Sequence, residues 1–158
     1  MDMAASNYNK LKKKYGLPEA SKLMERLEIE IEKDGGSEIL LQTLRNQVTD
    51  KLFDLMKVLE SILFTGEGSD PSLLYQEHIV EDVSKQGLGL YKIFNELHYH
   101  GLKLRFRHDR KSDGDFIKKV YNIWPGLEEK LFVFFEKLEN GWKEIDIEKE
   151  IKAETYHG

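Results

Sequence analysis

Five basic residues crowd into a short stretch in the second half of the chain, with one aromatic residue among them. The aromatic residue is Phe106, and the basic residues are Lys103, Arg105, Arg107, Arg110 and Lys111. Cations attract phosphate groups and an aromatic ring can stack on a base, so the cluster is a candidate phosphate or nucleic-acid site. Two other interpretations stay open. Cations stabilise the carboxyl end of a helix through its dipole, and they also suit an acidic protein partner.

A second group of cations lies near the amino terminus, at Lys10, Lys12, Lys13 and Lys14. We expect residues 1–16 to form a flexible basic arm that is exposed to solvent. Contact of this arm with nucleic acid or with an acidic partner is the alternative. The whole chain has a net charge of −5, which disfavours a general nucleic-acid binder but leaves room for a weak local site at residues 103–111.

Side chains with the spacing of metal ligands occur only in pairs. Glu96 and His100 are four residues apart, as are His78 and Asp82, so each pair shares a helix face. A zinc site needs three or four protein ligands. The chain has no cysteine, which excludes thiolate sites, disulfides and a cysteine nucleophile. We therefore predict no metal, no cofactor and no catalytic residues.

The run from Leu131 to Phe135 is apolar on every side of the helix that contains it. Leu131 and Phe134 belong to the face that packs inward, whereas Phe132 and Phe135 point to another side and need cover. Short helices and the carboxyl-terminal tail can supply that cover. Alternatively, Phe132 and Phe135 form a dimer interface or a groove for a protein partner.

Apolar residues spaced by three and four predict three long helices. They span residues 37–64, 81–107 and 115–140. Short connections predict that the helices form an antiparallel all-α bundle running up, down and up. Within the third helix, Pro125 removes one backbone hydrogen bond and predicts a kink near residues 121–124.

Residues with special capping or packing roles refine these helix boundaries. Ser37 is the predicted N-cap of the first long helix, and Ser112 or Asp113 is the predicted cap of the third. The Asn140-Gly141 pair predicts the end of the third helix. Gly101 should let a neighbouring helix approach closely.

Shorter segments should complete a single domain over residues 1–158. Helices are expected at residues 18–27 and 71–80, with an extended cover over the bundle at residues 28–34. Residues 142–158 should form a loosely docked tail or fray.

The leading functional hypothesis is a non-enzymatic interaction or scaffold protein that forms a homodimer through Phe132 and Phe135. The second is a nucleic-acid accessory protein that uses the basic cluster at residues 103–111, and the third is an enzyme. Residues 1–16 lack the apolar core of a secretory signal and no apolar run approaches 18 residues, so we expect neither a signal nor a membrane span and predict a cytoplasmic protein.

Overall fold

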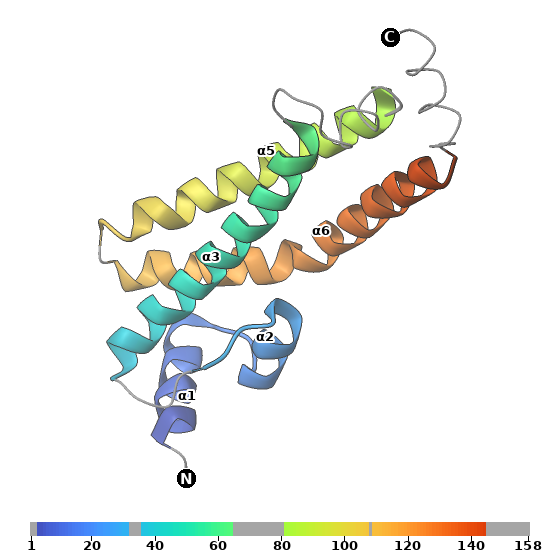
Figure 1. The fold of residues 1–158 in the computed structure, drawn as a ribbon. Helices are drawn as coiled ribbons and strands as arrows, with labels where there is room; N and C mark the ends of the chain where they lie inside the picture. The colour runs from blue at the N-terminus through green and yellow to red at the C-terminus, as the bar shows by residue number, and fades with distance from the viewer. Residues whose placement is uncertain (1–2, 32–35, 65–80, 108, 145–158) are drawn as a thin grey trace, which may run out of the picture.

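The structure is a computed structural model and describes residues 3–31, 36–64, 81–107 and 109–144. Every regular element in this part of the chain is a helix. The helices are α1 (Met3–Tyr15), α2 (Ala20–Leu27), α3 (Ser37–Leu63), α5 (Glu81–Leu104) and α6 (Arg110–Glu144). Figure 1 shows α3, α5 and α6 running in alternating directions, with α1 and α2 together at one end. This arrangement confirms the predicted all-α antiparallel bundle.

The predicted apolar faces form the core between the three long helices. On α3 the fully or nearly fully buried residues include Leu41, Leu44, Val48, Leu52 and Leu59. On α6 they include Ile117, Val120, Trp124, Leu127, Leu131, Phe134 and Leu138. The ring of Phe94 on α5 meets Trp124 edge-on, with 6.3 Å between ring centroids. Apolar burial of this extent is the main stabilising contribution to the bundle.

Two glycines of α5 lie where a side chain of any size would clash with a neighbouring helix. A Cβ atom on Gly101 would meet Phe116 Cζ at 3.0 Å and would come closer still to Thr49 Oγ1. A Cβ atom on Gly87 would be 2.8 Å from both Leu63 and Phe134. The prediction that Gly101 permits a close helix approach is therefore confirmed.

The capping predictions need correction at both helix starts. Gly36 occupies the N-cap position of α3, and Ser37 is its first helical residue. Helix α6 begins at Arg110, earlier than either predicted cap. Asp109 caps it, because its carboxylate accepts a hydrogen bond from the Lys111 backbone N–H at 3.2 Å and another from the Ser112 hydroxyl at 2.6 Å. The Ser112 bond and the backbone bonds hold the pKa of Asp109 below its usual value.

Helix α6 continues beyond its predicted end, through Asn140 and Gly141 to Glu144. A glycine ends a helix by adopting positive φ. Gly141 is absent from the residues with positive φ in the described part of the chain. Pro125 lies inside α6, and Figure 1 shows the helix changing direction near its middle, as the sequence predicts.

The expectation of a flexible arm at residues 1–16 is corrected, because residues 3–15 form α1. Tyr8 and Leu11 are buried against the bundle, with 1% and 3% of their surface exposed. The Tyr8 hydroxyl donates a hydrogen bond to the Pro18 carbonyl oxygen at 2.6 Å, and burial raises the pKa of Tyr8. Lys12 pairs with Glu19, so the first cations lie on a folded element.

After α2, Glu28 adopts a left-handed conformation and residues 29–31 are neither helix nor strand, while residues 32–34 of the predicted extended cover lie outside the described residues. Ile29 is buried. The backbone N–H of Glu30 donates to the Gln47 side chain at 2.9 Å, and the Gln47 amide donates back to the Glu30 carbonyl oxygen at 2.7 Å. The predicted helix at 71–80 and the tail after residue 144 lie outside the described residues. Among the described helices, none combines the length and apolar character needed to cross a bilayer.

Candidate functional site

The basic cluster lies where α5 turns into α6. Helix α5 ends at Leu104, and the backbone N–H groups of the next three residues bond to carbonyl oxygens three positions earlier, at 3.1 to 3.3 Å. Phe106 stands at this turn with 83% of its surface exposed. Lys103, Arg107 and Lys111 are exposed around it. The turn therefore presents three cations and one aromatic ring to solvent.

A buried ion pair fastens this turn to α3. The Arg45 guanidinium donates to the Asp113 carboxylate at 2.8 Å, and the two side chains are 4% and 1% exposed. The same Arg45 nitrogen donates to the Leu104 carbonyl oxygen at 3.2 Å. Arg45 thus joins the carboxyl end of α5 to the first turn of α6.

Arg105, one of the five predicted cations, faces α3. Its Nε donates to Asn46 Oδ1 at 3.0 Å, and its terminal nitrogen pairs with Asp50 Oδ1 at 3.1 Å. Arg105 therefore braces the turn, and Arg110 also has a contact within the chain. Lys103, Arg107 and Lys111 are the exposed members of the cluster, whereas Arg105 and Arg110 are half-buried. Sequence analysis missed Arg45, Asn46 and Asp50, because nothing in their spacing links them to residues far along the chain.

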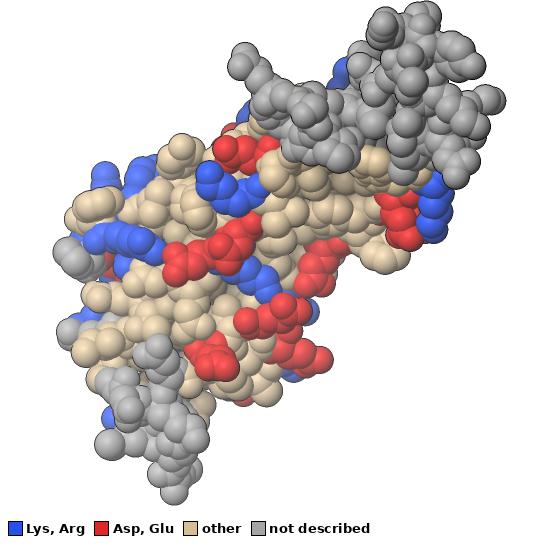
Figure 2. All heavy atoms as spheres, in the orientation of Figure 1, with Lys and Arg blue, Asp and Glu red and all other residues tan. Residues whose placement is uncertain are grey.

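The amino-terminal lysines lie on the neighbouring element. Tyr15 packs on Gly114, where a Cβ atom would be 3.1 Å from Tyr15 Cβ, and a Cβ on Gly16 would be 3.8 Å from Lys118 Nζ. Lys13 and Lys14 at the end of α1 are therefore close to the first turns of α6. Figure 2 shows Lys and Arg side chains gathered around the α5–α6 turn, whereas carboxylates gather over the middle of α3 and over α2.

The apolar surface predicted on α6 is present. Phe132 is 64% exposed and Phe135 is 36% exposed, whereas their neighbours Leu131 and Phe134 are 7% and 1% exposed. The ring of Phe135 contacts that of Phe134, with centroids 5.7 Å apart. In the described part of the chain, Phe132 is thus the aromatic residue of α6 with the largest exposed fraction.

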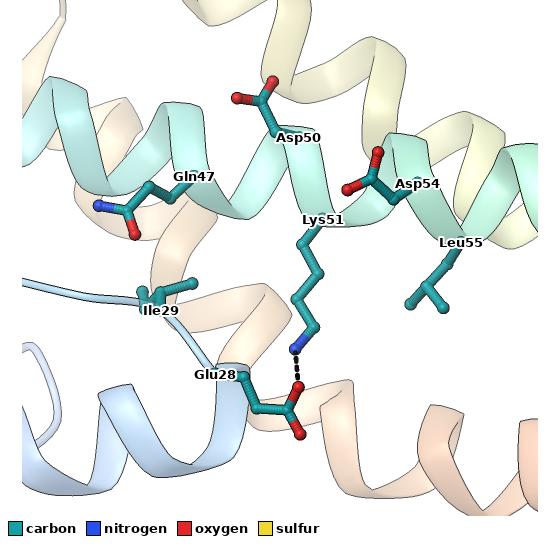
Figure 3. Close-up of a pocket in the computed structure, with 7 residues that line it drawn as sticks. All are labelled: Glu28, Ile29, Gln47, Asp50, Lys51, Asp54 and Leu55. Carbon is teal, nitrogen blue, oxygen red and sulfur yellow. Dashed lines mark hydrogen bonds and ion pairs between the residues drawn. The ribbon is translucent and has the colours of Figure 1, made fainter.

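A hollow of about 450 Å³ lies between α3 and the segment that follows α2. Its lining residues are Glu28, Ile29, Gln47, Asp50, Lys51, Asp54 and Leu55 (Figure 3). Figure 3 shows Lys51 extending from α3 across the hollow to Glu28, with 3.3 Å between the ion-pair atoms. Lys51 Nζ also donates to the Leu27 carbonyl oxygen at 2.6 Å, which satisfies the carboxyl end of α2.

A second hollow, of about 590 Å³, lies between α2 and α6 and shares Glu28 with the first. The Arg26 guanidinium stacks 4.0 Å from the centre of the Tyr121 ring and donates to the Tyr121 carbonyl oxygen at 3.2 Å. Trp124 Nε1 donates to Glu128 at 2.5 Å. Lys51 and Arg26 therefore hold α2 against α3 and α6, which is a structural role.

Glu96 and His100 gain no third potential metal ligand among the described residues. The His98 ring packs on Phe53, with 5.0 Å between centroids, and the His100 ring meets Phe116 at 5.2 Å. Glu96 pairs with Lys92 at 3.9 Å. His78 lies outside the described residues, and the part of the chain that the structure describes contains no group of three potential metal ligands.

Burial lowers the pKa of His100, and the charges of Lys119 and Lys103 lower it further. Lys103 and Lys119 therefore both lie near this imidazole, one on α5 and the other on α6. This places Lys119 on the same end of the bundle as the exposed cations of the turn, although the sequence cluster did not include it.

Comparison of the chain with protein-family models, curated proteins and solved structures gave no match.

Proposed function

We propose that the protein is a non-enzymatic interaction protein that forms a homodimer through the α6 surface containing Phe132 and Phe135. The observation that carries this proposal is the 64% exposure of Phe132 beside two nearly fully buried neighbours. Covering a large aromatic side chain with a partner removes its apolar surface from water, which lowers the free energy and favours association. Phe135 lies three residues away on the same helix and extends the apolar surface.

A twofold homodimer uses the same surface patch on both copies. The α6 helix of one copy would then lie against that of the other, with Phe132 and Phe135 near the centre of the contact. Glu128, Glu129 and Glu136 are exposed within about one turn of Phe132. At a twofold interface such carboxylates lie at the rim, where like charges repel and salt screens the repulsion. Raising the salt concentration should therefore leave the association intact or strengthen it.

The test is the association constant of the wild type and of Phe132→Lys, measured by sedimentation equilibrium. The lysine is compatible with an exposed helix position and lies beside several carboxylates, so the variant should fold. Desolvating its ammonium in a dimer is unfavourable. We expect association to weaken by at least about tenfold, which corresponds to about 1.4 kcal/mol.

Tyr99→Lys is the matched control. Tyr99 is 62% exposed and lies on α5, so the substitution is similar in size, charge and exposure but lies on another helix. This variant should associate like the wild type. Equal loss of association in Tyr99→Lys and Phe132→Lys, or no effect of Phe132→Lys on a dimer, would place the interface elsewhere.

A further inference from the structure

We infer that the end of the bundle around the α5–α6 turn is a binding site for single-stranded nucleic acid, in which Phe106 stacks on an unpaired base. We call this surface the basic end and define it by Phe106 and the exposed cations Lys13, Lys14, Lys103, Arg107, Lys111 and Lys119. The inference concerns a different surface from the proposed dimer interface and does not depend on it.

The first support is the segregation of charge along the chain. Residues 103–119 contain seven basic and three acidic side chains, and residues 3–18 contain four basic and no acidic ones. The net charge of the whole chain is nevertheless −5, so the rest of the molecule is strongly acidic. Helix α1 contacts α6, with Tyr15 close to Gly114, and this brings the two basic segments together. Such an end attracts a polyanion while the remainder repels it, which orients the partner.

The second support is the position of Phe106. Phe106 is 83% exposed, and it lies in the chain between the exposed cations Lys103, Arg107 and Lys111. The turn beneath it is held by the hydrogen bonds of Arg105 to Asn46 and Asp50 and by the buried pair of Arg45 with Asp113. A ring on a braced turn loses little conformational freedom when a ligand stacks on it.

The aromatic ring distinguishes between the possible polyanions. An unpaired base offers a free π-face, and stacking on an aromatic side chain contributes about 1–3 kcal/mol per base. The bases of a duplex are already stacked on one another, and an acidic peptide of Glu and Asp has no ring to stack. Cations beside an exposed aromatic ring are the combination that single-strand binding surfaces use.

The test is fluorescence anisotropy of labelled single-stranded DNA and RNA of about 16 nucleotides, with the duplex of the same sequence and polyglutamate as competing ligands. We expect the single strands to bind at about 50 mM salt and to be bound much more weakly at about 200 mM, because binding releases counterions. Phe106→Ala should weaken single-strand binding by about tenfold and leave any weak duplex binding unchanged.

A charge-reversal triple variant tests the cations. Lys103→Glu/Arg107→Glu/Lys111→Glu should abolish single-strand binding at both salt concentrations. The matched control is Lys92→Glu/Lys130→Glu/Lys143→Glu, which changes the net charge equally at exposed positions elsewhere on α5 and α6. The control should lose much less affinity for the single strand than the charge-reversal variant.

Three results would overturn the inference. They are the absence of single-strand binding at about 50 mM salt, equal weakening by the two triple variants, and binding that is insensitive to Phe106→Ala. In the last case, preference for the duplex or for polyglutamate would identify a different polyanion. Repeating the titration with Phe132→Lys keeps the two proposals separate, because that variant should bind the single strand like the wild type.

Discussion

Arg45 and Asp113 form an ion pair that is almost completely removed from water, with 4% and 1% of the side chains exposed. Desolvating two charges is unfavourable, and their mutual attraction at 2.8 Å offsets this penalty only while both partners are present. The pair also satisfies the Leu104 carbonyl oxygen at the end of α5. At the scale of single residues, this contact determines where the α5–α6 turn lies.

Arg45→Met should therefore lower the free energy of unfolding by about 3–5 kcal/mol, because it leaves the Asp113 carboxylate buried without its cation. Urea denaturation measures this change. The double variant Arg45→Met/Asp113→Leu should be less destabilised than the sum of the two single changes, since it removes both charges. Lys143→Met breaks an exposed pair with Glu139 and should change stability little. Equal effects of Arg45→Met and Lys143→Met would contradict the role of the buried pair.

His100 reports the electrostatic potential of the basic end. Its pKa is lowered from the ordinary value of 6.5, first by burial and then by Lys119 and Lys103. The unfolded state therefore binds a proton more readily than the folded state, and His100 lowers stability as the pH falls through about 6.5. Lys119→Gln should raise the pKa of His100, as measured by NMR titration. Lys130→Gln, farther along α6, should leave the pKa of His100 unchanged. A larger pKa shift in Lys130→Gln than in Lys119→Gln would show that Lys119 does not lower the pKa of His100.

At the scale of elements, the close approach of α3, α5 and α6 depends on glycines that an isolated helix would disfavour. Gly101 and Gly89 both lie inside α5, but a Cβ on Gly101 would clash with Thr49 and Phe116, whereas one on Gly89 would meet nothing within 4 Å. Substitution of alanine should consequently lower the stability at Gly101 and raise it at Gly89.

Gly101→Ala should destabilise the protein by about 1–3 kcal/mol, because helices in a packed core must shift to admit the methyl group. Gly89→Ala should stabilise it by up to about 1 kcal/mol through helix propensity alone. Thermal denaturation of the two variants shows directly whether each substitution raises or lowers the stability. Stabilisation by Gly101→Ala would show that α3 and α5 are not packed as closely as the structure indicates.

The long helices were predictable because each has an apolar face that repeats every three or four residues over many turns. The first residue of α6 could not be predicted, because Asp109, Ser112 and Asp113 are all good N-caps and only the fold selects Asp109. The helix α1 was missed because four lysines dominate its sequence. The spacing of Tyr8, Leu11 and Tyr15 on one helix face was the available signal.

At the scale of the whole molecule, the sequence located the basic cluster and the apolar surface but not their internal partners. The Arg105 contacts join residues 59 and 55 positions apart, and a local pattern cannot reveal such pairs. The exposure of Phe132 and Phe135 likewise depends on which helices cover α6. Sequence periodicity could show that these side chains lie off the inward-packing face of α6, but it could not determine how much of each side chain is covered.

The two proposed surfaces should differ in how their binding depends on salt, so a salt titration of each binding reaction separates them. Apolar contact on α6 should survive high salt, whereas the basic end should lose its polyanion as counterion release becomes less favourable.

Light scattering of the wild-type protein at two protein concentrations and two salt concentrations is the decisive test of the proposed homodimer. Dimer formation through α6 predicts a particle of twice the 18.5 kDa chain mass, with a dimer fraction that rises with protein concentration and does not fall at high salt. A particle of one chain mass at the higher protein concentration under both salt conditions would contradict it.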